Sequence, residues 1–152
     1  MTALFTLLPE AVETVKLDSK PAVLERLAER FEAVYGLDRA HVLARLNERE
    51  ELGSTGFGRG VAIPHARLDV DRPVAVFLRL ESPVGFDAAD DMPVELVFGL
   101  LSPEAAGVVH LHALAAISRM MRDDKMHRAL AEAPGREAIY ALIANVIDRD
   151  AA

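Results

Sequence analysis

The residues best suited to chemistry lie in the segment 53–67, where a glycine-rich stretch leads into a histidine. Four glycines occur in the eight residues 53–60, a composition that allows positive φ angles and close approach of the backbone to a ligand. The short apolar run that follows ends at Pro64, directly before His65. Because Pro64 fixes its own φ and restricts the preceding residue, we expect His65 to be presented from a stiff backbone. A lone histidine is more often a structural or surface residue, so its neighbours must decide whether it is functional.

The residues near this histidine suit a phosphoryl group. Backbone N–H groups of the glycine-rich loop could form an anion-binding nest, and Ser54 and Thr55 add hydroxyl donors. Arg49 lies just before the loop, and its guanidinium can bind two phosphate oxygens at once. On spacing alone, Arg49 is equally compatible with a charge at a helix end that pairs with Glu48 or Glu51. We predict phosphate binding by Arg49, Ser54 and Thr55.

Other ligand classes fit the sequence less well. The pattern Gly56-x-Gly58-x-Gly60 superficially matches a dinucleotide fingerprint, but that motif follows a strand and opens a helix, whereas this one leads into a strand. No Gly-Lys-Ser/Thr ending marks a nucleotide P-loop. His110 and His112 are two residues apart, so on a helix they face different ways and do not converge on a metal. We treat His41 and His127 as solvated, and we predict no metal and no cofactor.

Hydrophobic periodicity predicts helices interleaved with strands. One helix is expected between Ser19 and Gly36, and a second from the N-cap Asp38 to about Leu52. Three further helices are expected at about 108–122, 124–131 and 136–147. β-prone runs predict buried strands at 61–63, 74–80 and 94–101, and turn residues predict a small hairpin at 83–87. This order argues for α/β layers.

The composition is that of a single compact domain over residues 1–152. The chain has 24 acidic and 17 basic residues and a net charge of -7 without a basic cluster, so nucleic acid is not an expected partner. The absence of cysteine excludes disulfides, thiolate metal sites and a cysteine nucleophile. The longest uncharged run, 105–118, is too short to span a bilayer, and the start of the chain has no basic leader. We expect no membrane insertion and a cytoplasmic location.

A family resemblance begins at Glu50. This residue, followed after six others by Phe57-Gly58-x-x-Val61-Ala62-Ile63-Pro64-His65-Ala66, resembles the phosphorylation-site signature of the fructose/mannitol class of enzyme IIA, a component of the bacterial phosphotransferase system. The resemblance continues through 93–98, 101–104 and 110–115 in the same order and at similar spacing, so it covers essentially the whole chain. Gly53-Ser54-Thr55-Gly56 is most similar to the stand-alone nitrogen-type branch of the family.

The chain departs from the family pattern at two places. Ala66 stands where glycine is common, although the signature tolerates a small residue there. The apolar pair Val108 and Val109 precedes His110, where the family usually has more polar residues. The second departure leaves the position of His110 less well defined by the resemblance.

The resemblance implies a fold, a reaction and a partner. It implies an α/β domain with a mixed, roughly five-stranded sheet flanked by helices on both faces. It also implies that Nε2 of His65 accepts a phosphoryl group from an HPr-type phosphocarrier, and that Arg49 and His110 bind the transferred oxygens. A histidine in the first turn of a helix could add helix-end N–H groups to the same anion. The alternative for His110 is an ordinary helix residue beside Leu114 and Ile117.

The functional outcome has two main alternatives. The protein is expected to be a nitrogen-type regulatory enzyme IIA whose phosphorylation is read by a target protein. Alternatively, it is the stand-alone IIA of a fructose/mannitol-type permease that passes phosphate to a IIB cysteine. Because this chain has neither a cysteine nor a membrane span, the IIB and transport components would be separate proteins. A hydrolase with His65 as general base lacks a nucleophile and an orienting carboxylate at a recognisable spacing.

Overall fold

The computed structural model of the protein describes residues 4–105 and 107–151, with side chains as far as Asp148. The helices are η1 (Pro9–Ala11), α1 (Lys20–Tyr35), α2 (Arg39–Glu51), α3 (Gly107–Arg122), α4 (Asp124–Glu132) and α5 (Arg136–Ala151). The strands are β1 (Val12–Val15), β2 (Gly56–Gly58), β3 (Val61–Ala62), β4 (His65–Leu68), β5 (Val74–Val84) and β6 (Val94–Pro103). The α/β prediction is confirmed.

The strands form one open, mixed sheet. Its order is β1-β5-β6-β3-β2, and β4 also pairs with β6. The two long strands β5 and β6 are antiparallel, whereas β1 runs parallel to β5, and both β3 and β4 run parallel to β6. The described sheet therefore has six strands where roughly five were expected. The extra strand arises because Ile63 and Pro64 divide one edge of the sheet into β3 and β4.

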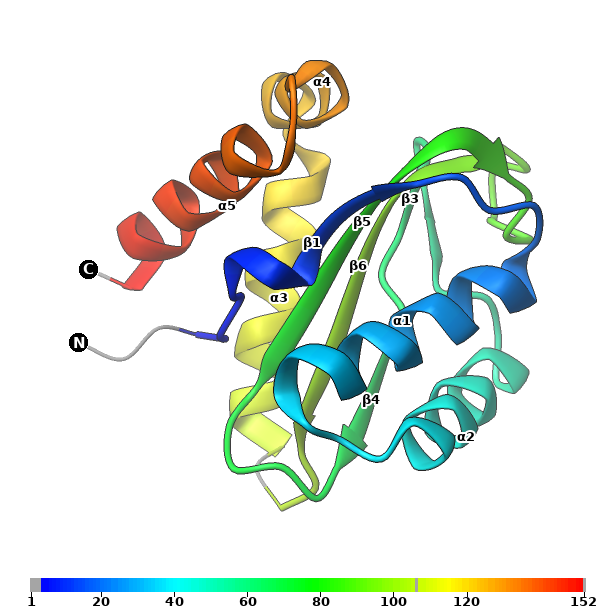
Figure 1. Ribbon diagram of the computed structural model, residues 1–152, viewed down its shortest axis with the longest axis vertical. Coiled ribbons are helices and arrows are strands. Elements are labelled where there is room, and N and C mark those ends of the chain that lie inside the picture. Colours follow the sequence, from blue (N-terminus) through cyan, green and yellow to red (C-terminus); the bar gives the residue numbers. More distant parts are fainter. Residues whose placement is uncertain (1–3, 106, 152) are drawn as a thin grey trace.

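Helices cover both faces of the sheet. Figure 1 shows α1 and α2 on one face and α3 on the other. On the first face α1 packs so closely that a Cβ on Gly99 of β6 would lie 3.0 Å from Leu27 and 3.3 Å from Phe31. Glycine at this central position therefore lets the helix approach the sheet. The C-terminal helix α5 contacts β1 at the opposite edge from the β3 and β4 strands.

The ends of α1 and α2 follow the signals in the sequence. The Ser19 hydroxyl accepts a hydrogen bond from the N–H of Ala22, and Gly36 closes α1 in the left-handed conformation at φ 72°. Asp38 accepts from the N–H of Ala40 and begins α2, which ends at Glu51. Both predicted helices are confirmed. These caps fix both ends of α1 and the start of α2, whose last turn carries Arg49.

Three short strands and one turn differ from expectation. Strands β1, β2 and β4 were not predicted, because no long apolar run marks them in the sequence. The predicted small hairpin at 83–87 is wrong, because Pro83 and Val84 continue β5 and Val84 pairs with Val94 of β6. Phe86 then turns inward and is fully buried, so residues 85–93 link the two central strands.

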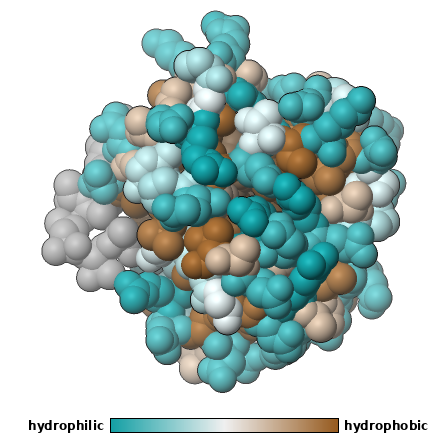
Figure 2. Space-filling view, in the orientation of Figure 1, coloured by the Kyte–Doolittle hydropathy of each residue, from teal (hydrophilic) through white to brown (hydrophobic). Residues whose placement is uncertain are grey.

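The face of the molecule seen in Figure 1 is mainly hydrophilic, with separate apolar areas between the polar side chains (Figure 2). Among the described residues, no helix combines the length and apolar character that crossing a membrane requires.

Candidate functional site

His65 begins β4, directly after the break that Pro64 makes in this edge of the sheet. The break turns the Ile63 carbonyl toward the imidazole, and Nδ1 of His65 lies 2.7 Å from that oxygen. A carbonyl can only accept a hydrogen bond, so Nδ1 carries the proton and donates. The lone pair of the neutral ring is therefore on Nε2.

Arg49 contacts this second nitrogen. Its Nε donates to Nε2 of His65 over 3.3 Å, and its Nη1 donates to the carbonyl of Gly53 over 2.8 Å. The first bond requires an acceptor at Nε2, which is the state that the Ile63 carbonyl imposes. The second bond holds the guanidinium at the mouth of the glycine-rich loop. One tautomer of His65 thus satisfies every hydrogen bond that its ring makes.

The imidazole of His65 is held in its neutral form. Burial lowers the pKa of His65, and the charge of Arg49 lowers it further, while the Ile63 carbonyl and the Glu50 carboxylate act in the opposite direction. At neutral pH the ring is therefore mainly uncharged. An uncharged imidazole with a free lone pair is a nucleophile.

His110 faces His65 from α3. It lies in the first turn of this helix, is 6% exposed, and has its ring centroid 5.6 Å from that of His65. Burial lowers the pKa of His110 to about 4, and the proximity of His65, which is charged only when protonated, and of the Arg67 guanidinium lowers it further. Its Nδ1 is buried and has no hydrogen-bond partner in the described part of the chain. The site therefore brings together the predicted residues His65, Arg49 and His110.

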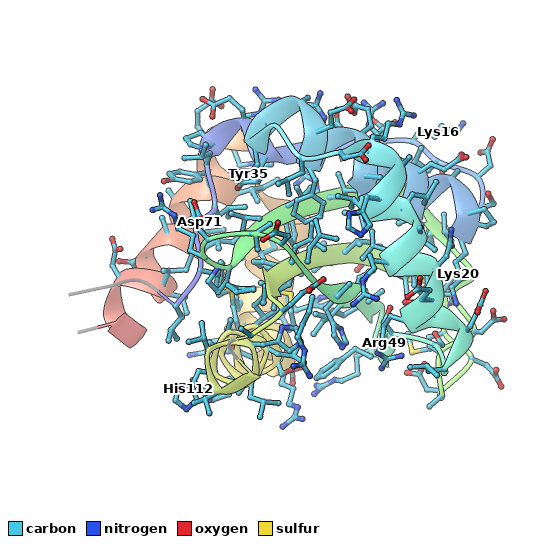
Figure 3. The ribbon with its side chains drawn as sticks, turned by 90° about the horizontal axis from the view of Figure 1, so that it is seen from below. Lys16, Lys20, Tyr35, Arg49, Asp71 and His112 are labelled. Carbon is cyan, nitrogen blue, oxygen red and sulfur yellow. The ribbon has the colours of Figure 1, made fainter. Side chains whose placement is uncertain are left out.

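These three residues line a pocket of about 330 Å³. Figure 3 shows Arg49 on α2 and the start of α3, near His112, at the same end of the molecule. The complete lining is Arg45, Glu48, Arg49, Leu52, His65, Ala66, Arg67 and His110. Three arginines and one glutamate make the pocket basic, although the whole chain carries a net charge of -7.

The sequence reasoning missed Arg45 and Arg67. A signal existed for both: Arg45 precedes Arg49 by one helical turn, and Arg67 follows His65 by two residues in a strand, which places each pair on a shared face. Arg45 donates to the carbonyl of Arg67 over 3.0 Å and to Glu48 over 2.9 Å. The first of these bonds ties α2 to β4 beside the pocket, and the second lies within α2.

Ser54 and Thr55 are not part of the pocket lining. The hydroxyl of Ser54 donates to the carbonyl of Phe86, and the hydroxyl of Thr55 donates to the carboxylate of Glu50. The backbone N–H of Thr55 also donates to Glu50, over 3.1 Å. Both hydroxyls are thus engaged with protein acceptors, and phosphate binding by them stays a prediction that would require these bonds to break.

The tip of the glycine-rich segment, residues 58–60, is not part of the pocket lining. Gly58, Arg59 and Gly60 have positive φ, and the N–H of Arg59 donates to the Asp90 carboxylate over 2.8 Å. His127 lies against this turn, and it is partly buried, with Nε2 3.7 Å from Glu95, so the expectation that it is solvated is wrong. His41 is exposed as expected. No described residue of 53–60 lines the pocket, so the segment acts there mainly through the Gly53 carbonyl.

A neutral imidazole beside arginines and a second histidine is an arrangement suited to an anionic group. Comparison with known proteins gives the class: residues 7–146 match the family of the phosphoenolpyruvate-dependent sugar phosphotransferase system, EIIA 2. The chain belongs to this family.

Individual relatives agree with this assignment. The chain is 41% identical over 138 residues to a nitrogen regulatory protein of Bradyrhizobium diazoefficiens, covering 90% of each. It is 34% identical to the fructose-specific EIIA component of Haloferax volcanii, covering 97% of this chain and 99% of that protein. The crystal structure of nitrogen regulatory protein IIA-Ntr from Neisseria meningitidis is similar in fold, with a TM-score of 0.85 and 35% identity over 90% of this chain and 95% of that one.

Proposed function

We propose that the protein is a phosphoryl carrier in which Nε2 of His65 accepts a phosphoryl group from an HPr-type phosphocarrier. The observation that supports this most directly is the 2.7 Å hydrogen bond from Nδ1 of His65 to the Ile63 carbonyl. It holds the proton on one nitrogen and leaves the lone pair on the other, beside Arg49. Membership of the family supports the same reaction class.

In the proposed transfer, the lone pair on Nε2 of His65 forms a bond to phosphorus while the bond from phosphorus to the donor imidazole breaks. The electron pair of the broken bond returns to the donor nitrogen. The proton stays on Nδ1, so the ring of His65 gains the positive charge that the donor ring loses. The Ile63 carbonyl, which accepts from Nδ1, stabilises that charge.

Arg49 and His110 are proposed to bind the transferred oxygens. An incoming phosphoryl group takes the place of the hydrogen bond between Arg49 and Nε2, so the guanidinium then faces the phosphoryl oxygens. His110, with its ring 5.6 Å from that of His65, can donate an imidazole N–H to the same group. Phosphoryl transfer needs positioning and charge stabilisation more than covalent assistance, and these residues provide both.

Exposed apolar side chains neighbour the pocket residues along the chain and suit a protein donor. Leu52 lines the pocket, and Val108, Val109 and Leu111 flank His110; their exposed fractions lie between 43% and 84%. We call these four residues the apolar rim. A phosphocarrier must bring its own phosphohistidine next to His65, so its surface has to cover this rim. Burial of the rim in the complex would favour docking.

The nitrogen-type branch is the preferred assignment within the family, with a cytoplasmic location and a regulatory protein as target. The relative from Bradyrhizobium and the structure from Neisseria, both named nitrogen regulatory proteins, support it. The alternative is a stand-alone IIA that passes phosphate to a IIB cysteine, and the fructose-specific relative from Haloferax supports that alternative.

One experiment distinguishes the two. The protein is phosphorylated with phosphoenolpyruvate, enzyme I and the phosphocarrier, and membranes with a panel of sugars are added afterwards. A regulatory protein should keep its phosphate whichever sugar is supplied. Rapid loss of the label with one sugar, together with formation of that sugar phosphate, would establish the transport role.

A further inference from the structure

The carboxylate of Glu50 is the focus of a buried network beside the site. Its side chain is 7% exposed, and Nζ of Lys20, at the start of α1, lies 2.9 Å from Oε1. The same carboxylate accepts from the backbone N–H of Thr55 over 3.1 Å and from the Thr55 hydroxyl. A buried carboxylate with one cation and two hydrogen-bond donors is held in a fixed place.

Lys20 is itself fixed. Its side chain is 18% exposed, its ammonium lies 4.8 Å from the centre of the Phe86 ring, and its other acidic neighbour, Asp87, is 3.9 Å away and 89% exposed. Solvent screens Asp87 far more than Glu50. Lys20 and Glu50 therefore form a nearly buried pair, and Figure 3 shows Lys20 and Arg49 near the C-terminal end of α2, where Glu50 lies.

Glu50 is linked to the phosphoryl acceptor through the backbone: it accepts from the N–H of Thr55, the Thr55 carbonyl accepts from the N–H of Ile63 over 3.0 Å, and the Ile63 carbonyl accepts from Nδ1 of His65. The negative charge of Glu50 raises the pKa of His65, opposing the effect of burial and of Arg49. A carboxylate that favours the positive charge of an added proton must disfavour phosphorylation, because the two negative charges of the phosphoryl oxygens outweigh the one positive charge that the ring gains. Glu50 therefore favours protonation of His65 and disfavours its phosphorylation, because a proton adds positive charge and a phosphoryl group adds net negative charge.

We propose that the Glu50–Lys20 pair sets the phosphoryl-transfer potential of His65: Glu50 keeps the phosphorylated form from becoming too stable to discharge, and Lys20 limits that effect. The proposal rests on the proposed function of His65. The transfer is the exchange described above, in which a phosphorus–nitrogen bond forms on one protein as another breaks on its partner. Glu50 is a positioning and tuning residue, because it contacts Thr55 and Lys20 and not the reacting atoms.

The remaining charged groups around the ring stay unchanged when this pair is altered. Those that face the pocket are Arg45, Glu48 and Arg49 from α2, Arg67 from β4, and His110 from α3. A comparison of variants of Glu50 and Lys20 therefore isolates the pair. Glu50→Gln keeps an acceptor for the Thr55 N–H and removes the negative charge, whereas Lys20→Met keeps a long side chain over the Phe86 ring and removes the positive charge.

The test is the sign of the two effects. The equilibrium constant for phosphoryl exchange with the phosphocarrier is measured for each variant by quantifying both phosphoproteins after mixing. We expect Glu50→Gln to shift the equilibrium toward phosphorylated His65 and Lys20→Met to shift it away, each by about three- to tenfold, the effect of one partly screened charge. Loss of packing or order would instead shift both variants in the same direction.

A second readout needs no phosphoryl transfer. The pKa of unphosphorylated His65, followed by NMR, should fall in Glu50→Gln and rise in Lys20→Met. Thr55→Val serves as the matched control, since it removes the hydroxyl donor to Glu50 and leaves both charges in place. Shifts of equal sign in the two charge variants, or no shift in either measurement, would overturn the proposal. Failure of wild-type His65 to be phosphorylated, with the NMR shifts present, would instead count against the proposed function.

Discussion

The Nε atom of Arg49 donates to Nε2 of His65 over 3.3 Å, so in the proposed transfer the guanidinium occupies the position that an incoming phosphoryl group needs. Its other hydrogen bond, from Nη1 to the Gly53 carbonyl over 2.8 Å, keeps it beside that position when the first bond breaks. Under the proposed function, Arg49 exchanges its hydrogen bond to Nε2 of His65 for hydrogen bonds to the phosphoryl oxygens and keeps its bond to the Gly53 carbonyl.

Replacing Arg49 should slow transfer without moving the site of modification. We expect Arg49→Ala to reduce the rate of phosphoryl uptake by His65 about 10- to 1,000-fold, the range for removal of one electrostatic stabiliser. Arg49→Lys should recover only part of the rate, because lysine lacks the planar fork. Rapid-quench measurement with charged phosphocarrier gives the rates. An unchanged rate in Arg49→Ala would show that Arg49 does not assist the transfer and is only a charge at the end of a helix.

His110 should make the stability of the fold depend on pH. Its pKa is lowered from the usual value near 6.5 to about 4 in the folded protein, so the unfolded chain binds the proton more readily between these values. The stability that neutral His110 contributes is present above about pH 6.5 and is lost as the pH falls toward 4. Denaturant unfolding at a series of pH values should show this loss in the wild type.

The matched variant is His110→Gln, which has no titrating group. We expect its free energy of unfolding to fall less between pH 6.5 and 4, by about 1 to 3 kcal/mol. The lowered pKa of His65 has the same sign and will leave a residual slope. Parallel curves for the two proteins would show that His110 titrates normally.

The apolar rim should affect docking and not chemistry. The double variant Val108→Ser with Leu111→Ser is expected to raise the KM for the charged phosphocarrier about tenfold, since each side chain contributes roughly 1 kcal/mol or less on burial. Labelling of His65 by phosphoramidate, a small donor that needs no docking surface, should be unchanged. Met92→Ser is the control, because Met92 is 50% exposed and is not part of the pocket lining. Equal KM values for the rim and control variants would remove the rim from the interface.

Gly56 should not tolerate a side chain. A Cβ at this position would lie 2.8 Å from the Cβ and 3.0 Å from the Cα of Ala88, and 3.0 Å from the Ser54 hydroxyl. Because backbone has to move, we expect Gly56→Ala to lower the free energy of unfolding by about 1 to 3 kcal/mol. Gly53→Ala offers a comparison, since a Cβ at Gly53 meets nothing within 4 Å, although its φ of 144° still favours glycine. Chemical denaturation measures the free energy of unfolding of both variants. A Gly56→Ala variant as stable as the wild type would contradict the prediction.

The long elements were predictable because their signals are local. Ser19, Gly36 and Asp38 act on neighbouring backbone groups, and β5 and β6 carry apolar runs long enough to be recognised. The short strands β1 and β4 were missed because pairing with distant residues, and not local propensity, forms them. Strand β2 pairs with the nearby β3, but its glycine-rich sequence has low β-propensity. The hairpin predicted at 83–87 failed for a related reason: burial of Phe86 overrides the turn preference of its neighbours.

The part of the candidate site that depends on residues adjacent in the sequence was predictable. Pro64 before His65 indicated a fixed imidazole, and the structure supplies the reason in the Ile63 carbonyl two residues earlier. The bonds of Ser54 and Thr55 to Phe86 and Glu50 were not foreseeable, since they depend on how the 85–93 link packs and on where α2 ends. Composition shows that hydroxyls are present, whereas only the fold determines which acceptors they meet.

The central claim is that Nε2 of His65 carries the phosphoryl group. The most direct measurement is NMR of the ¹⁵N-histidine-labelled protein after incubation with phosphoenolpyruvate, enzyme I and the phosphocarrier, with His65→Ala as the control. We predict one new phosphohistidine, acid-labile and stable in alkali, with phosphorus bonded to Nε2 of His65 and Nδ1 still protonated against the Ile63 carbonyl. A phosphoryl group on Nδ1, on another residue, or equally on the His65→Ala variant would contradict the account.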